Sequence, residues 1–119
     1  MARSSIASIA AHLPEQSTAV FTVAFKDEDG AAVEPKSITW DLSDVGGNII
    51  NEREGEVIIT PAETVNIVLS GDDLKISAGF SGETEERVLT VEAVYDSDLG
   101  NDLPLKSECH FYIDNLIKI

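Results

Sequence analysis

Residues 27–40 read Asp-Glu-Asp-Gly-Ala-Ala-Val-Glu-Pro-Lys-Ser-Ile-Thr-Trp, and this stretch decides the fold. It begins as an acidic turn, because Gly30 tolerates the positive φ of tight turns and Asp side chains accept hydrogen bonds from nearby N–H groups. Pro35 then marks the entry into a strand that carries Trp40, the only tryptophan. This order of acidic turn, proline and strand is typical of a β-sandwich.

Apolar and polar residues alternate on both sides of this stretch. A period of two indicates strands that bury one face, because successive side chains of a strand point to opposite sides. The spacing predicts five inward rows, at residues 21–25, 38–42, 65–69, 89–95 and 107–113. It also predicts two shorter strands, one at residues 49–51 and one that begins at residue 57 and ends before Pro61.

Three stretches break the alternation. Residues 45–48 (Val-Gly-Gly-Asn) predict a turn. Residues 77–86 are rich in Gly, Ser and Glu and predict a mobile loop, and residues 96–104 predict a polar connection. The chain therefore reads as short strands joined by turns and loops.

Residues 1–16 allow two interpretations. Apolar residues between Ile6 and Leu13 fit the spacing of a helix, whereas the surrounding alternation favours a first strand, which we expect. The apolar run at residues 6–11 ends at His12, so it is too short and too polar for a signal peptide or a membrane span. We expect cytoplasmic synthesis, with no signal peptide, no transmembrane segment and no membrane partner.

The totals predict one all-β domain, residues 1–119. A domain of this length buries roughly two-thirds of the surface of its unfolded chain, and the 43% hydrophobic content argues against disorder. The number of predicted rows indicates a β-sandwich of about seven strands. Cys109 is the only cysteine, so the domain has no internal disulfide.

The charge is strongly acidic. The chain has 22 acidic against 8 basic residues, a net charge of -14. Such a field repels phosphate backbones, and no Lys/Arg cluster offsets it, so we expect no nucleic-acid partner. The acidity allows three readings: simple solubility, cation binding in loops, or docking to a basic partner surface.

Two stretches resemble bacterial and phage immunoglobulin-like domains, of which the invasin/intimin-type repeats are the best known. The first is Val23–Gly30 with Val33-x-Pro35 and Ile38–Trp40, similar to the second and third strands of such domains. The second is Thr90–Tyr95, similar to the penultimate strand, where a tyrosine often lies near a corner. The resemblance covers residues 17–114 and implies an immunoglobulin-like Greek-key sandwich.

We expect the chain to differ from surface adhesins, because it starts with its own Met1 and we expect a single unit with neither a secretion signal nor an anchor. It therefore looks like the small proteins of tailed-phage and prophage structural modules. This resemblance implies a non-catalytic virion-associated protein of a head, neck or tail, which binds other virion components or itself. Strand edges and the apolar end at residues 116–119 are the expected contact surfaces. The alternative is a cell-surface adhesion or carbohydrate-binding module.

A calcium site is the one metal hypothesis that the residues support. Asp96, Asp98, Asn101 and Asp102 offer the oxygen ligands that calcium prefers, within one loop. The spacing departs from an EF-hand, and a solvated loop without any metal or other cofactor is the plainer reading. The acidic pairs and triplets at residues 27–29 and 72–73 are weaker forms of the same hypothesis.

The remaining reactive side chains predict structure rather than catalysis. Trp40 and Cys109 share the phase of inward rows, so we expect a core tryptophan rather than a sugar platform, and a buried thiol. Tyr112 points outward and is a candidate contact residue. His12 and His110 have no catalytic motif around them, and we expect no enzyme activity.

Overall fold

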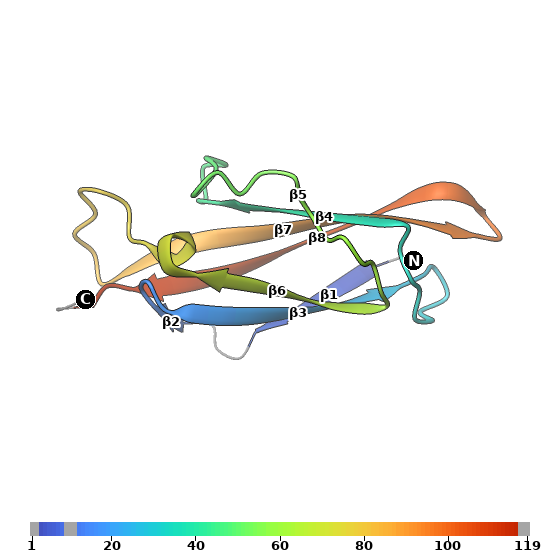
Figure 1. Cartoon of the computed structure of the whole chain (residues 1–119), viewed down its shortest axis with the longest axis horizontal. Helices are drawn as coiled ribbons and strands as arrows, with labels where there is room; N and C mark the ends of the chain where they lie inside the picture. Colours follow the sequence, from blue (N-terminus) through green and yellow to red (C-terminus); the bar gives the residue numbers. More distant parts are fainter. Residues whose placement is uncertain (1–2, 9–11, 117–119) are drawn as a thin grey trace.

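The computed structural model describes residues 3–8 and 12–116 and folds them into two β-sheets that pack face to face (Figure 1). The molecule is elongated, with extents of 53 × 24 × 23 Å. Its elements in chain order are β1 (Arg3–Ser8), β2 (His12–Pro14), β3 (Thr18–Lys26), β4 (Ser37–Ser43), β5 (Glu56–Val57), β6 (Thr64–Ser70), the 3₁₀ turn η1 (Gly71–Leu74), β7 (Thr84–Ser97) and β8 (Gly100–Asp114). The predicted all-β fold is confirmed.

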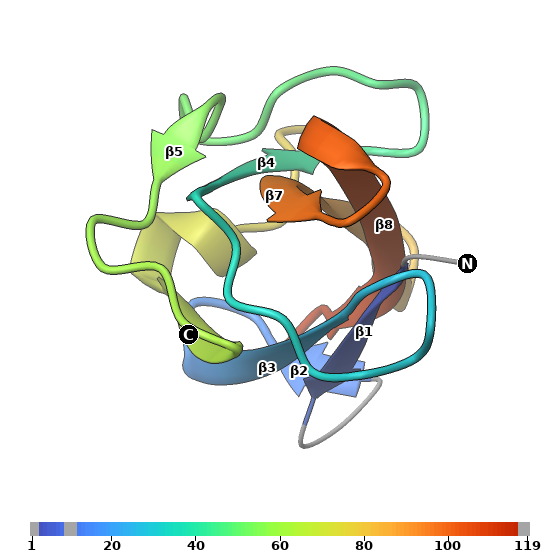
Figure 2. The same cartoon turned by 90° about the vertical axis from the view of Figure 1, so that its right-hand side faces the viewer.

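The strand order is β1-β3-β6 in one sheet and β2-β8-β7-β4-β5 in the other (Figure 2). Neighbouring strands are antiparallel, except that β2 runs parallel to β8. The N-terminal segment is thus divided between the sheets, β1 in one and β2 in the other. The expected strand in residues 1–16 is confirmed for residues 3–8 and 12–14, whereas residues 1–2 and 9–11 lie outside the described part.

Alternate side chains of both sheets form one core. Phe21 of β3 and Phe111 of β8 are fully buried, and their ring centroids lie 5.0 Å apart across the two sheets. The inward rows of β4, β6 and β7 complete the same cluster. Trp40 is 8% exposed within it, so its predicted place in the core is confirmed.

The acidic turn after β3 is built by its first residue. Asp27 Oδ1 accepts hydrogen bonds from the N–H groups of Asp29 at 2.9 Å and Ala31 at 3.0 Å. Gly30 has φ 81°, where a side chain would be strained, so glycine suits this position. The chain then returns past the buried Pro35 into β4, as predicted.

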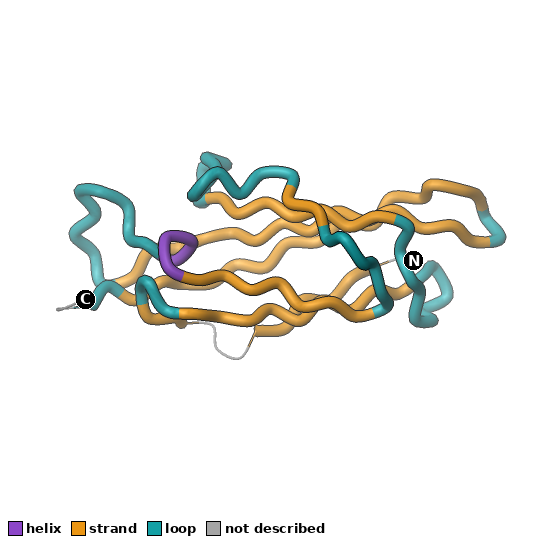
Figure 3. The backbone as a smooth tube through the Cα atoms, viewed as in Figure 1, coloured by secondary structure: helices purple, strands orange, loops and turns teal. Residues whose placement is uncertain are grey.

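The prediction of a polar connection at residues 96–104 is wrong. β7 and β8 pair across 14 and 15 residues, and only Asp98 and Leu99 lie between them at the tip (Figure 3). The register shifts between Tyr95 and Ser97, which marks a β-bulge. Polar side chains are compatible with this extension because the hairpin projects past the other strands, where both faces meet solvent.

Two predicted short strands are also corrected. Residues 49–51 form no strand, because only an isolated bridge joins Ile49 to Ser43, and Asn51 and Glu52 take positive φ values in a turn. β5 ends at Val57, and Ile59 is 92% exposed outside it. The loop predicted at residues 77–86 ends at residue 83, where β7 begins.

The contact between the sheets yields a stability prediction. We expect Phe111→Ala to lower the free energy of unfolding by about 3–5 kcal/mol, because it leaves a cavity opposite Phe21. The matched control is Tyr112→Ala on the outer face of the same strand, where Tyr112 is 37% exposed; we expect a loss of about 1 kcal/mol or less. Urea unfolding measures both, and equal losses would contradict the described inward phase of β8.

Candidate functional site

Polar side chains gather at both ends of the sandwich. One group lies at the β7–β8 hairpin and includes the residues predicted to bind calcium. The other lies beside η1 and the loop at residues 75–83, at the opposite end of the long axis (Figure 1). Of this second group, the sequence suggested only the acidic pair at residues 72–73.

Lys36 bridges two carboxylates of the hairpin. Its Nζ donates to Oδ1 of Asp102 at 2.6 Å and to Oδ1 of Asp96 at 3.4 Å. The hydrogen bond to Asp102, followed by that to Asp96, raises the pKa of Lys36. The N–H group of Asp102 also donates to Asp96 and lowers the pKa of that carboxyl group. A side-chain ammonium group therefore already contacts both carboxylates and offsets one of their two negative charges.

The structure brings together two of the four calcium candidates. Asp96 and Asp102 converge on Lys36, whereas Asp98 lies at the hairpin tip and Asn101 on the strand beyond it, both exposed. The calcium site stays a prediction, and Lys36 is the group with which a metal ion would compete.

The acidic turn brings three carboxylates together. Ligand oxygens of Asp27, Glu28 and Asp29 lie within 4.8 Å of one another. Glu28 Oε1 accepts hydrogen bonds from the hydroxyl groups of Tyr95 at 2.9 Å and Ser97 at 3.0 Å. Burial and the contact with Glu28 raise the pKa of Tyr95. Glu28 thus ties the acidic turn to the hairpin, which gives this cluster a structural role.

At the other end, Asp73 is a buried carboxylate that accepts hydrogen bonds from three residues. Arg53 Nε and Asn51 Nδ2 each donate to its Oδ1 at 2.8 Å, and the N–H group of Ser70 donates to its Oδ2 at 3.1 Å. Burial alone would raise the pKa of Asp73, but these hydrogen bonds outweigh it and lower the pKa. Asp73 thereby holds the loop between β4 and β5 against η1, and it is not a free metal ligand.

Arg87 is buried in the inward row of β7. Its guanidinium group donates to Oε1 of Glu85 at 2.5 Å, to the hydroxyl oxygen of Ser77 at 3.2 Å and to the carbonyl oxygen of Lys75 at 3.1 Å. Burial would raise the pKa of Glu85, but the Ser77 N–H group and Arg87 lower it overall. The ion pair anchors the loop at residues 75–83 to the sheet.

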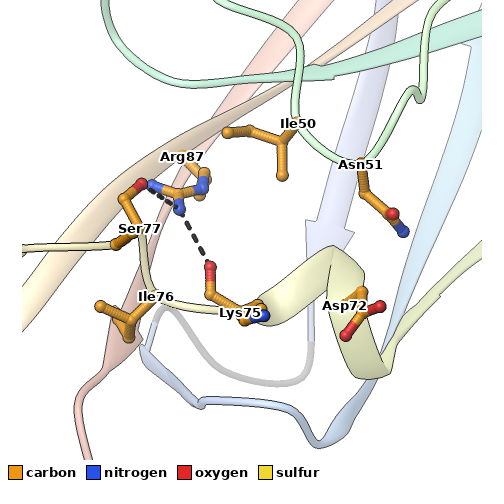
Figure 4. A pocket seen from close by; sticks show the side chains of 8 residues that line it. Ile50, Asn51, Asp72, Lys75, Ile76, Ser77 and Arg87 are labelled. Atoms are coloured by element: carbon orange, nitrogen blue, oxygen red, sulfur yellow. Dashed lines mark hydrogen bonds between the residues drawn. The ribbon is translucent and has the colours of Figure 1, made fainter.

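A cavity of about 370 Å³ adjoins this ion pair. In Figure 4, Ile76 and Ser77 lie on the same side of the cavity as Arg87, Asn51 and Asp72 lie on the opposite side, and Ile50 lies between them at the top of the view. The Nε atom of Arg87 is buried without a hydrogen-bond partner. The cavity is thus walled by mixed apolar and charged groups, and its one buried cation is already paired with Glu85.

The histidines and the cysteine occupy β2 and β8. His110 lies between Glu86 and Glu108, and hydrogen bonds to Glu108 and then Glu86 raise its pKa. His12 stacks on Tyr112, with ring centroids 5.1 Å apart. Cys109 is half-buried rather than fully buried, and burial raises the pKa of its thiol. These contacts describe surface pairs and a thiol kept in its protonated form.

Arg87 was not predicted as a site residue, although the sequence contains a signal for it. Counting back by two from Leu89 places Arg87 and then Glu85 in the inward phase of the same row, which predicts a buried ion pair. Arg53 and Lys36 gave no such signal for their contacts with Asp73 and with the hairpin, because these partners lie 20 and 60 or more residues away in the chain.

Comparisons with protein-family models, with curated proteins and with solved structures find no match. Within the described residues, no helix has the length and apolar character needed to cross a membrane. The geometry of the chain's own residues is therefore the basis for a functional proposal.

The Lys36 bridge yields a test of calcium binding. We expect millimolar calcium to shift the melting temperature of the unmodified protein by less than about 1 °C, because Lys36 occupies Asp96 and Asp102 and offsets one of their two negative charges. Lys36→Met leaves these carboxylates unbalanced, and there we expect calcium to raise the melting temperature by about 3 °C. Lys106→Met, which removes an exposed lysine near Glu92, is the control. Equal shifts in all three proteins would refute the competition.

Asp73 yields a pH-dependent prediction. We expect Asp73→Asn to lower the free energy of unfolding at neutral pH by about 2–4 kcal/mol, since Arg53 loses its negatively charged partner and one of the two acceptor oxygens becomes an NH₂ donor. The folded pKa of Asp73 lies below its unfolded value of 3.8. Its contribution is therefore complete above pH 3.8 and is lost as the pH falls through the folded pKa.

Urea titrations followed by Trp40 fluorescence measure this effect, with Arg53 5.7 Å from the indole ring. The exposed neighbour Asp72→Asn is the control, and we expect it to change stability by about 0.5 kcal/mol or less. A difference between the unmodified protein and Asp73→Asn that stayed constant down to pH 2 would contradict the assignment.

Proposed function

We propose that this chain is a non-catalytic assembly module, an immunoglobulin-like Greek-key domain associated with the virion of a phage or prophage at a head, neck or tail. The observation that carries the proposal is the strand order β1-β3-β6 and β2-β8-β7-β4-β5. Its first strand is divided between the sheets, with β2 parallel to the last strand. This arrangement supports the family resemblance of the residues around Trp40 and Tyr95.

The polar groups support a structural role. The hydrogen bonds of three charged side chains hold a loop or the hairpin against the sheets. These side chains are Lys36, Asp73 and Arg87. Catalysis instead requires a nucleophile or an acid–base pair directed at a substrate. Side chains that hold the fold in this way suit a module whose surface, rather than a reaction, is its function.

The elongated shape also suits assembly. A long axis of 53 Å against about 24 Å gives a large lateral surface for its mass. Exposed apolar side chains are distributed over that surface, including Val57, Ile59 and Val68. Isolated apolar residues are ordinary on protein surfaces, but they supply contact area when a partner covers them.

Particle composition tests the proposal. We expect phage particles purified from the strain that encodes this chain to contain it at a fixed copy number relative to the major capsid protein, measured by quantitative mass spectrometry. A tagged chain found only in the host's soluble fraction, while the particles are complete, would refute the proposal.

One observation favours the alternative, an adhesion or carbohydrate-binding module. The stacked pair of His12 and Tyr112 presents an aromatic face at the surface, and sugars bind on such faces. Binding to a glycan array that Tyr112→Ala abolishes would favour this alternative over the virion protein.

A further inference from the structure

The two sheets have four edge strands, and β6 differs from the other three. β2 and β5 have only three and two residues, and β1 has six. β6 has seven residues, Thr-Val-Asn-Ile-Val-Leu-Ser, with no charge, proline or glycine. Natural edge strands usually carry such protective residues, because an unprotected edge pairs with other chains.

The hydrogen-bond pattern shows which groups of β6 face outward. The N–H group of Phe25 donates to the carbonyl oxygen of Glu63 at 3.0 Å, and that of Gly71 donates to the carbonyl oxygen of Ser17 at 3.1 Å. These two contacts bracket the β3–β6 ladder, in which hydrogen-bonded pairs alternate. The odd-numbered residues of β6 therefore bond to β3, and the even-numbered residues direct their N–H and C=O groups away from it.

The contact of Ser70 agrees with this assignment. Its N–H group points away from β3 and donates to the carboxylate of Asp73. The outward backbone groups that are left for a partner are those of Thr64, Asn66 and Val68, whose side chains are all exposed. Figures 1 and 2 show β6 at one margin of its sheet, with β3 on its other side.

The charges around this edge select the partner. β6 is uncharged, but exposed Glu63 and Asp72 flank its two ends, and the whole chain carries a net charge of -14. We infer that β6 binds an extended segment of a partner protein, a run of β-branched residues flanked on both sides by Lys or Arg. Such a segment adds a fourth strand to β1-β3-β6, so its backbone bonds to β6 and its basic ends pair with Glu63 and Asp72.

A second copy of this chain fits the edge less well. In an antiparallel β6–β6 pair, Glu63 of one copy would lie near Asp72 of the other, and in a parallel pair each would face itself. Like charges at such positions are destabilising, and two chains of net charge -14 repel each other.

A peptide titration tests the inference. The probe is a nine-residue peptide with five alternating valine and threonine residues between a Lys-Arg pair and an Arg-Lys pair. We expect it to shift the backbone amide resonances of Thr64, Asn66 and Val68 and to slow the hydrogen exchange of these amides. A peptide with the same centre and acidic ends should bind at least about tenfold more weakly.

Two variants at one position separate the backbone from the side chain. Val68→Pro removes an outward N–H group and leaves the ladder to β3 intact, so we expect the affinity to fall about tenfold or more. Val68→Ala keeps the N–H group, and we expect a change of about threefold or less. Melting temperatures check that both variants fold. If Val68→Pro does not fold, the comparison of the basic and acidic peptides on the unmodified protein still tests the inference.

Three results would overturn the inference. The first is a set of amide-resonance shifts confined to another edge strand. The second is equal binding of the basic and acidic peptides, and the third is concentration-dependent pairing of the protein through β6 without peptide. The choice of a virion partner rests on the proposed function, but the titration does not. Particles that incorporate Val68→Pro as well as Val68→Ala would refute the edge as the virion contact, whereas particles that lack the protein altogether would refute the proposed function.

Discussion

The burial of alternate side chains between two sheets is the constraint on which this structure depends. Phe21 and Phe111 meet at its centre, and because they belong to different sheets, their contact fixes how the sheets face each other. A shift of one residue in either strand would turn its whole apolar row to solvent. The loops, the hairpin and the polar ends are consequently positioned by the register of β3 and β8.

The same constraint explains what the sequence could predict. The rows around Phe21, Trp40 and Leu89 were recognisable because a strand with one buried face repeats every two residues. The extent of the β7–β8 hairpin was not, because residues 96–104 project beyond the core and need no apolar row. Their pairing depends on a partner strand and on the Lys36 bridge, which local composition does not encode.

The polar ends show the corresponding limit for the candidate site. Asp96 and Asp102 were recognised as oxygen ligands, but the cation beside them is Lys36, whose position follows from the fold. Asp73 was grouped with Asp72 as an acidic pair, yet one carboxylate is buried beneath Arg53 and the other is exposed. The residue types predicted that these carboxylates can bind a cation. Tertiary contacts determined which of them are already paired with a basic side chain.

The parallel pairing of β2 with β8 has a mechanical consequence. β1 begins and β8 ends at opposite ends of the long axis (Figure 1), and His12–Pro14 lie beside Tyr112–Asp114. A tensile force between the two ends would load these hydrogen bonds in shear, so that several must break together rather than one after another. A domain with this strand arrangement resists extension along its long axis. Such resistance suits a protein that has to stay folded when force acts between its two ends.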